Sequence, residues 1–211
     1  MPSTELTCGA EKLASTAGSS VIYTPANWFE PLDWSRVFAV ERPIEIDLGC
    51  GKGAFLFWAA CTQPQRNFVG VDRLLRRLRR VDRKAVHAGL QNLRLLRIES
   101  TYLISKLIPD CSVSTYHVLF PDPWPKRRHH GRRLICAPFL ADLRRTLTMG
   151  GIVNCATDHE EYFVWIQREF QKDGGFIQGQ PASLPEEAWT DFERKFVAAG
   201  KEVYRSRWQK R

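Results

Sequence analysis

The stretch PIEIDLGCGKGA, residues 43–54, joins an apolar run to a turn that is rich in glycine. The run Pro43–Gly49 predicts a buried strand, and the residues Ala54–Cys61 after the turn predict a helix. Glycines in such a turn let the backbone bend sharply and come close to a bound molecule. The stretch therefore predicts a strand, a tight turn and a helix, with a ligand held where the strand ends.

The alternation of strand and helix continues along the chain. It indicates an α/β protein with a mostly parallel sheet covered by helices on both faces, in which ligands bind outside the carboxyl ends of the strands. The segment Gly174–Trp189 is predicted to be a surface connection, and Glu202–Trp208 a last strand that returns antiparallel to the edge of the sheet. The other predicted strands are Phe68–Asp72, Asn92–Ile98, Val113–Phe120 and Ile152–Ala156, and the other predicted helices are Arg73–Gly89, Phe139–Leu147 and Glu160–Gln171.

Length and charge set the next expectations. A chain of 211 residues is expected to form one domain, placed at residues 43–211, after a lead-in segment of residues 1–42 with a short helix or two. The net charge of +8 favours polyanionic partners. The sequence has neither a signal-peptide pattern nor a stretch suited to a membrane span, so we expect a cytoplasmic protein with no membrane partner. Six scattered cysteines without a CxxC pair predict no metal site.

Acidic residues stand at the ends of three successive predicted strands, at positions Asp47, Asp72 and Glu99. The glycine turn fits a dinucleotide-binding fingerprint, so a nicotinamide enzyme and a methyltransferase that uses S-adenosylmethionine both remain possible. Asp47 would repel a pyrophosphate and attract a cationic sulfonium or amino group, which favours S-adenosylmethionine. Asp72 can accept both ribose hydroxyls, and Glu99 is placed to meet the adenine end.

The stretch FPDPWPKRRHHGRRL, residues 120–134, follows the fourth predicted strand. Its three prolines restrict the backbone, so Asp122 and Trp124 are expected on a stiff loop. A carboxylate and an aromatic face can receive a nucleobase, and the basic residues of Lys126–Arg133 supply charge for its phosphates. The basic helix predicted over Arg73–Lys84 is interpreted as a solvated face that contributes electrostatically to RNA capture and lies outside the site.

The segment PDPWPKRRHHGRR strongly resembles the signature of the bacterial TrmB-type tRNA (guanine-N7)-methyltransferases. Ala156–Asp158 followed by Tyr162 is similar to that family's TD segment, and Thr190–Glu193 followed by Gly200 is similar to its TxFE motif. The resemblance runs from about Glu45 to the C-terminus. It implies a Rossmann-like class I methyltransferase fold, with a mostly parallel seven-stranded sheet, helices on both faces and an antiparallel C-terminal strand.

The resemblance also implies an activity, which is transfer of methyl from S-adenosylmethionine to N7 of guanine 46 in the tRNA variable loop, forming 7-methylguanosine. The implied partner is tRNA, and the protein is expected to be a monomer or homodimer. Asp122 is implied as the catalytic residue. The implied cofactor-binding residues are Asp47, Gly49, Gly51, Asp72, Glu99 and Asp122, and the implied substrate-binding residues are Lys126, Arg128, His129, Arg132, Arg133, Asp158, Thr190 and Glu193.

The chain departs from the family pattern at Gly131, where Lys is usual, and at Ala188-Trp189, where Arg-Pro often stands; the first forty residues match nothing recognised. Several other functions compete with this interpretation. Methylation of an exocyclic amine would fit a DPPY-type loop after the fourth strand, and the loop of this chain does not have that pattern. Methylation of cytosine C5 needs a nucleophilic cysteine on the loop, and residues 120–135 have none. A small-molecule methyltransferase leaves the arginines without a role. A nicotinamide oxidoreductase, and a catalytically silent RNA-binding subunit or chaperone, remain as competing interpretations.

Overall fold

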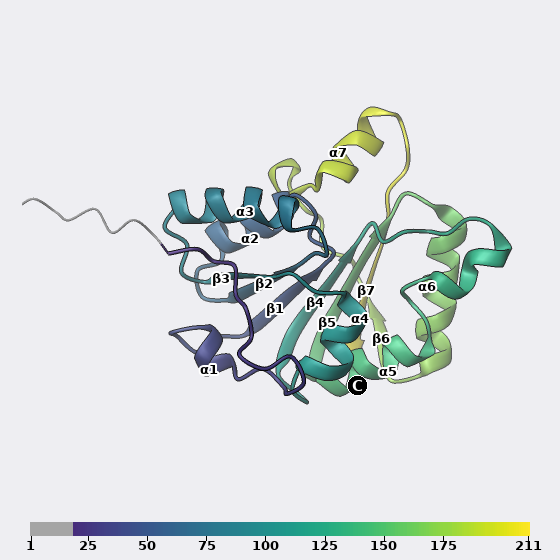
Figure 1. Ribbon diagram of the computed structural model, residues 1–211. Coiled ribbons are helices and arrows are strands. Elements are labelled where there is room, and N and C mark those ends of the chain that lie inside the picture. Colours follow the sequence, from purple (N-terminus) through teal and green to yellow (C-terminus); the bar gives the residue numbers. More distant parts are fainter. Residues whose placement is uncertain (1–18) are drawn as a thin grey trace, which may run out of the picture.

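The computed structural model describes residues 19–211, and these residues form a seven-stranded sheet between two layers of helices (Figure 1). The strand order is β3-β2-β1-β4-β5-β7-β6. Strands β1 to β5 are parallel, whereas β7 runs antiparallel to β5 and β6. The strands are β1 (Ile44–Leu48), β2 (Asn67–Val71), β3 (Leu93–Leu96), β4 (Val113–Leu119), β5 (Leu147–Thr157), β6 (Phe176–Gly179) and β7 (Tyr204–Lys210). The predicted fold class is confirmed.

The helices divide between the two faces of the sheet (Figure 1). Helices α2 and α3 lie on one side, and α4, α5 and α6 lie on the other, while α7 stands above the strand ends. The α-helices are α1 (Trp34–Val37), α2 (Ala54–Thr62), α3 (Leu75–His87), α4 (Ser100–Tyr102), α5 (Ala137–Thr146), α6 (Glu160–Asp173) and α7 (Asp191–Ala198). A π-helical turn η1 (Leu103–Leu107) and the 3-10 turns η2 (Arg127–Arg132) and η3 (Glu186–Ala188) complete the set.

Each face of the sheet buries its own apolar cluster, and β1 explains how one strand serves both. All five residues of β1 are buried, as expected for a central parallel strand covered on both sides. Ile44, Ile46 and Leu48 enter the cluster under α4, α5 and α6. Because side chains alternate along a strand, Glu45 and Asp47 face the α2 side, where Glu45 lines a cavity with residues of α2. The strand thus carries two buried carboxylates toward one face.

The segment before β1 is packed onto the sheet from residue 21. Val21 and Tyr23 exchange backbone hydrogen bonds with Leu95 of β3, so this segment extends the sheet beyond β3. The short helix α1 places Val37 in the core, and Phe38 after it is buried as well. The part of the expected lead-in that comprises residues 1–18 lies outside the described residues.

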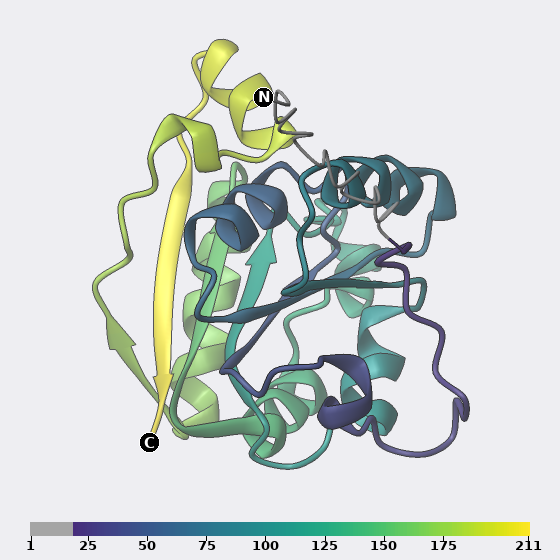
Figure 2. The same ribbon diagram turned by 90° about the vertical axis from the view of Figure 1, so that its left-hand side faces the viewer.

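Two details of the predicted sheet were wrong. The last strand, β7, does not lie at the edge but between β5 and β6 (Figure 2). The edge strand is β6, which lies inside the segment Gly174–Trp189 that was predicted to be a surface connection. Only Phe176 of its four residues is buried, so the strand has no alternating apolar pattern by which the sequence could reveal it.

Candidate active site

The glycine turn after β1 has the backbone conformation that its sequence predicts. Gly49, Gly51 and Gly53 have φ values of 81°, 58° and 69°, in the left-handed region that favours glycine. A Cβ at Gly53 would lie 2.6 Å from a methyl carbon of Val81, so this glycine lets α2 and α3 pack closely. A Cβ at Gly49 would meet no atom within 4 Å. The first part of the turn therefore faces open space, as a binding loop requires.

Asp47 is more deeply buried than Asp72 and Glu99, with 3% of its surface exposed. The pKa of the Asp47 carboxyl is raised to about 7, chiefly because the group is buried; the charge of His117 opposes the shift, and the nearby Asp72 carboxylate adds to it. No described residue donates a hydrogen bond that would stabilise its charge. A buried acid in this state is prepared to gain a cationic partner, because the partner would offset the cost of burying the charge.

Asp72 follows β2 and ties the glycine turn to α3. Its carboxylate accepts hydrogen bonds from the backbone N–H of Gly51 at 3.2 Å and of Leu74 at 2.7 Å. The Arg77 guanidinium donates to the same carboxylate at 3.1 Å. Asp72 is 6% exposed, so its oxygens are largely held by the protein. A ligand hydroxyl that binds Asp72 would share it with Arg77.

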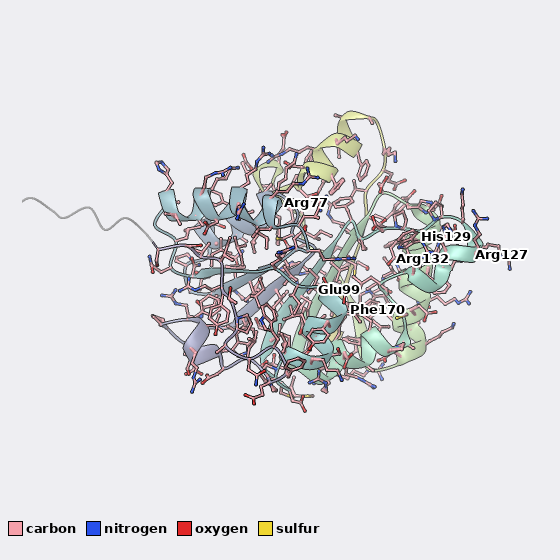
Figure 3. All side chains as sticks on the ribbon, viewed as in Figure 1. Arg77, Glu99, Arg127, His129, Arg132 and Phe170 are labelled. Atoms are coloured by element: carbon pink, nitrogen blue, oxygen red, sulfur yellow. The ribbon has the colours of Figure 1, made fainter. Side chains whose placement is uncertain are left out.

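Glu99 comes after β3 and is the N-cap of α4. Its carboxylate accepts a hydrogen bond from the backbone N–H of Tyr102 at 2.8 Å. The side chain is exposed and lies on the same side of the molecule as the ends of β1 and β2 (Figure 3). Asp47, Asp72 and Glu99 therefore stand at the carboxyl ends of three adjacent parallel strands, which confirms the place predicted for them.

The loop after β4 carries Asp122 in an exposed position between two residues with unusual backbone angles. Phe120 and Trp124 have φ values of 55° and 44°, which only a few non-glycine residues adopt. The backbone N–H of Phe120 still bonds Ala156 of β5 at 2.7 Å, so the loop leaves the sheet only after this point. The Asp122 side chain, between these two residues, is exposed to solvent.

Arg133 fixes this loop from the interior of the protein. Its side chain is fully buried and donates from Nε to the carbonyl oxygen of Pro123 at 3.0 Å and from Nη2 to Glu161 of α6 at 3.1 Å. The guanidinium also lies over the rings of Tyr162 and Trp165, at 5.1 and 5.0 Å from their centroids. Arg133 therefore joins the Asp122 loop to α6, and it does not lie on the surface with the other arginines of the segment.

The rest of the basic segment forms η2, which projects at one side of the molecule (Figure 3). Lys126, Arg127, Arg128 and Arg132 are exposed, and His129 is half-buried. The Arg132 guanidinium lies 5.1 Å from the centroid of the Trp124 ring, and His129 meets the same ring edge-on at 5.8 Å. Trp124 thus serves as the platform on which the basic segment packs.

Helix α7 bridges the strand ends from above (Figure 1). At its start Asp191 forms an ion pair with Lys52 of the glycine turn at 3.3 Å. Near its end Phe196 packs against Phe120, with ring centroids 5.6 Å apart. Lys201, just beyond the helix, donates to the Asp158 carboxylate after β5 at 2.6 Å. The helix therefore links the glycine turn, the Asp122 loop and Asp158.

Thr190 and Glu193 hold α7 in place. The Thr190 hydroxyl caps the helix by accepting from the backbone N–H of Glu193 at 3.0 Å. The Glu193 carboxylate, 2% exposed, pairs with the Arg205 guanidinium of β7. Both side chains are engaged within the protein, so their contacts are those of residues that position the helix.

A comparison with family models finds that residues 41–206 match the family described as putative methyltransferase. The chain is 36% identical over 184 residues to the tRNA (guanine-N(7)-)-methyltransferase of Sodalis glossinidius, and the match covers 83% of this chain and 75% of the relative.

The chain belongs to the tRNA (guanine-N7)-methyltransferase family.

Another member, from Thermotoga maritima, is 33% identical over 175 residues; the match covers 82% of this chain and 56% of that relative, so the chain spans little more than half of its length. Among solved structures, the 16S rRNA methyltransferase KamB superposes with a TM-score of 0.64 at 19% identity, covering 86% of this chain and 94% of the other. The family is thus shown by sequence, and the class I methyltransferase fold is shown by structure.

Within this family member, sequence reasoning missed the residues that support the site. Lys201 and Arg205 hold Asp158 and Glu193, and Phe196 packs on the Asp122 loop. One signal for α7 was present in the sequence, because Thr190 followed three residues later by Glu193 is the pattern of a helix N-terminus.

Among residues 19–211, no helix is long and apolar enough to cross a membrane, and no group of three or more His, Cys, Asp and Glu side chains could hold a metal ion.

Proposed function

We propose that this protein transfers a methyl group from S-adenosylmethionine to N7 of guanine in tRNA, at position 46 of the variable loop. The observation that carries the proposal is the exposed Asp122 carboxylate, on a clamped loop between the acidic strand ends and the basic segment η2. The names of the Sodalis and Thermotoga relatives support the same reaction.

The residues at the strand ends fit S-adenosylmethionine. The open space at Gly49 and the left-handed turn leave room for a ligand against the backbone, and the buried Asp47 forms no ion pair with any of residues 19–211. Asp47 would hold the amino group of the cofactor and Asp72 its ribose hydroxyls, while Glu99 would meet the adenine end. When bound, the cofactor supplies an electrophilic methyl group on a sulfonium.

The chemistry at guanine requires alignment and charge stabilisation from this chain. Guanine N7 has a free lone pair and carries no proton, so its methylation needs no strong base, only an in-line approach to the methyl carbon. Positive charge develops on the purine as the bond forms. The Asp122 carboxylate would accept from the N1 and exocyclic amino hydrogens and stabilise that charge, with Asp158 on the neighbouring loop as a second acceptor.

The remaining residues divide into RNA contacts and supports. Lys126, just before η2, and Arg128, His129 and Arg132 on η2 would contact tRNA phosphates. Arg133 positions the Asp122 loop from inside the protein, and Thr190 with Glu193 positions α7 over the strand ends. The guanine in folded tRNA would leave its stack to reach the carboxylates.

The test is transfer of labelled methyl from S-adenosylmethionine to unmodified tRNA, with nucleoside analysis of the product. We expect the label in 7-methylguanosine, its loss when guanine 46 of the tRNA is replaced by adenine, and a loss of about a hundredfold or more in kcat for Asp122→Ala and Asp122→Asn. Label in another nucleoside would overturn the assignment of N7.

The competing function, a catalytically silent RNA-binding subunit, predicts a different pattern. Equilibrium dialysis with S-adenosylmethionine separates the two, because the enzyme retains the cofactor and an Asp47→Ala variant does not. Binding of tRNA without retention of the cofactor and without methyl transfer would establish the silent subunit instead.

A further inference from the structure

The outward face of α3 carries a dense row of basic side chains. The helix contains 13 residues, and its buried side chains Leu78, Val81 and Ala85 occupy one narrow stripe. The opposite side of the helix is exposed and basic over its whole length, because the cationic residues recur at helical spacing. The exposed basic residues on this helix and at its entry are Arg73, Arg76, Arg79, Arg80, Arg83, Lys84 and His87.

None of these seven side chains forms an ion pair with an acidic residue among residues 19–211, whereas some other surface cations do. Elsewhere, Arg36 pairs with Asp33 and Lys172 with Glu169, and the same holds for several other surface cations. On α3, the acid Asp82 is turned to the side and accepts from the backbone N–H of Val21 at 2.7 Å. The seven basic residues therefore face solvent next to one another, a repulsive arrangement that a polyanion would relieve.

The position of this face relates it to the site. The chain enters α3 directly after Asp72, whose carboxylate accepts from Leu74, so the basic row begins beside the candidate cofactor residues. At about 1.5 Å per residue the helix extends the row by about 20 Å. In Figure 1, α3 and the η2 side of the molecule lie at opposite ends of the strand-end edge, with α7 between them. Arg80, Arg83, Lys84 and His87 line one hollow at the far part of the row.

We propose that the basic face of α3 is a second anchoring surface for tRNA, on which it binds the phosphates of a double-stranded arm while the strand-end site holds the target loop. The inference rests on the proposed function, since it takes tRNA as the substrate. A nucleic-acid duplex carries a charge about every 2 Å of its axis, so a basic row of this length meets several phosphates at once. Such contacts fix orientation without reading sequence, which suits an enzyme whose target lies elsewhere in the molecule.

The test measures tRNA affinity as a function of salt for the full chain. The variant replaces Arg76, Arg80, Arg83 and Lys84 by Gln, which keeps helix propensity and touches no residue assigned to catalysis or cofactor binding. A second variant replaces the three arginines by Lys and so keeps the charge. The matched control replaces Lys106 and Lys172 by Gln, which removes exposed cations from η1 and α6. Circular dichroism and the melting temperature verify that each variant folds.

We expect the Gln variant to bind tRNA at least about tenfold more weakly at moderate salt and to lose about 3 from the slope of log affinity against log salt. The Lys variant and the control keep the wild-type slope within about 1. The kcat at saturating tRNA stays within about twofold for all three. If the wild type binds tRNA tightly and the Gln variant shows the same affinity and the same salt slope, the inference about α3 is wrong, while the proposed function still stands. Absence of 7-methylguanosine with the wild type would overturn the proposed function whatever the slopes.

Discussion

The buried Arg133 guanidinium donates to the carbonyl oxygen of Pro123 at 3.0 Å, and through this bond helix α6 controls the loop that carries Asp122. The same arginine lies over the Tyr162 and Trp165 rings, so it is fixed by packing as well as by hydrogen bonds. A surface arginine in a basic segment would contact RNA directly. This one acts instead on the geometry of the carboxylate beside it.

Replacement of Arg133 should therefore damage stability and catalysis while leaving RNA affinity nearly intact. Arg133→Leu removes the clamp and the cation–π contacts, at an expected cost of about 2–4 kcal/mol in the free energy of unfolding. We expect kcat to fall at least about tenfold with the dissociation constant for tRNA within about threefold. Denaturant unfolding, single-turnover transfer and filter binding measure the three quantities.

The exposed Arg128 provides the matched control for this prediction. Arg128→Leu should leave the free energy of unfolding within about 0.5 kcal/mol and weaken tRNA binding instead. A reversal of the two patterns, with Arg133→Leu weakening tRNA binding and not stability, would show that Arg133 reaches the RNA.

The ion pair between Glu193 and Arg205 leads to a second prediction, which separates an effect on stability from an effect on substrate binding. Glu193→Ala leaves the half-buried Arg205 guanidinium without its partner and should cost about 2 kcal/mol of stability. Thr190→Ala removes only the cap of α7 and should cost about 1 kcal/mol. The double variant Glu193→Leu/Arg205→Met should recover most of the loss from Glu193→Ala, which a double-mutant cycle of unfolding free energies measures. If Glu193 acts only on substrate, the single variant will lower activity without altering stability.

The sequence was sufficient for the parts of the site that local pattern determines. Asp47 and Asp72 end buried strands of a parallel sheet, and parallel strands bring their carboxyl ends to one edge, so their proximity follows from the pattern alone. The positive φ values of Gly49 and Gly51 follow in the same way from the turn that they form.

The supports of the site could not be predicted because they depend on contacts far apart in the chain. Arg133 has the same side chain as Arg127 and Arg128, and only the folded structure shows that it alone is buried. Lys201 and Asp158 are 43 residues apart, and their pairing requires the position of α7 above β5. Strand β6 is held by its hydrogen bonds to β7 and has little apolar surface, so tertiary pairing decides its conformation.

We expect replacement of glycine by alanine to have different effects at two positions of the glycine turn, Gly53 and Gly49. Gly53→Ala places a Cβ 2.6 Å from Val81 in a left-handed conformation, so α2 and α3 must separate and stability should fall by at least about 2 kcal/mol. Gly49→Ala meets no neighbour and should cost about 1 kcal/mol for its backbone conformation. The new methyl group at Gly49 would nevertheless enter the space that we propose for the cofactor.

Calorimetry and thermal unfolding distinguish the two variants. We expect Gly49→Ala to lose S-adenosylmethionine affinity by at least about tenfold with a small loss of stability, and Gly53→Ala to show a large loss of stability. Normal cofactor affinity in Gly49→Ala would place the cofactor away from this turn.

Because Asp47 is buried, we expect the free energy of unfolding and the affinity for the cofactor to change in opposite directions as pH changes. Its pKa is raised to about 7 by burial, so between pH 4 and 7 the folded chain without cofactor binds a proton that the unfolded chain releases. The free energy of unfolding therefore falls as pH rises through this range, and the full cost is present above pH 7. Asp47→Asn removes that cost and should be more stable than the wild type at pH 8, by on the order of 2–4 kcal/mol, with the difference vanishing near pH 4.

Binding of the cationic cofactor has the opposite dependence, because the ionised carboxylate is the form that holds it. Wild-type affinity for S-adenosylmethionine should therefore decrease as pH falls below 7, and Asp47→Asn should bind weakly at every pH. Unfolding in denaturant from pH 4 to 8 and calorimetry with the cofactor measure both effects, with the exposed Glu30→Gln as the control, which should stay within about 0.5 kcal/mol of the wild type. A stability difference that is constant with pH would mean that Asp47 remains ionised in the folded chain, and the opposition between folding and binding would then not exist.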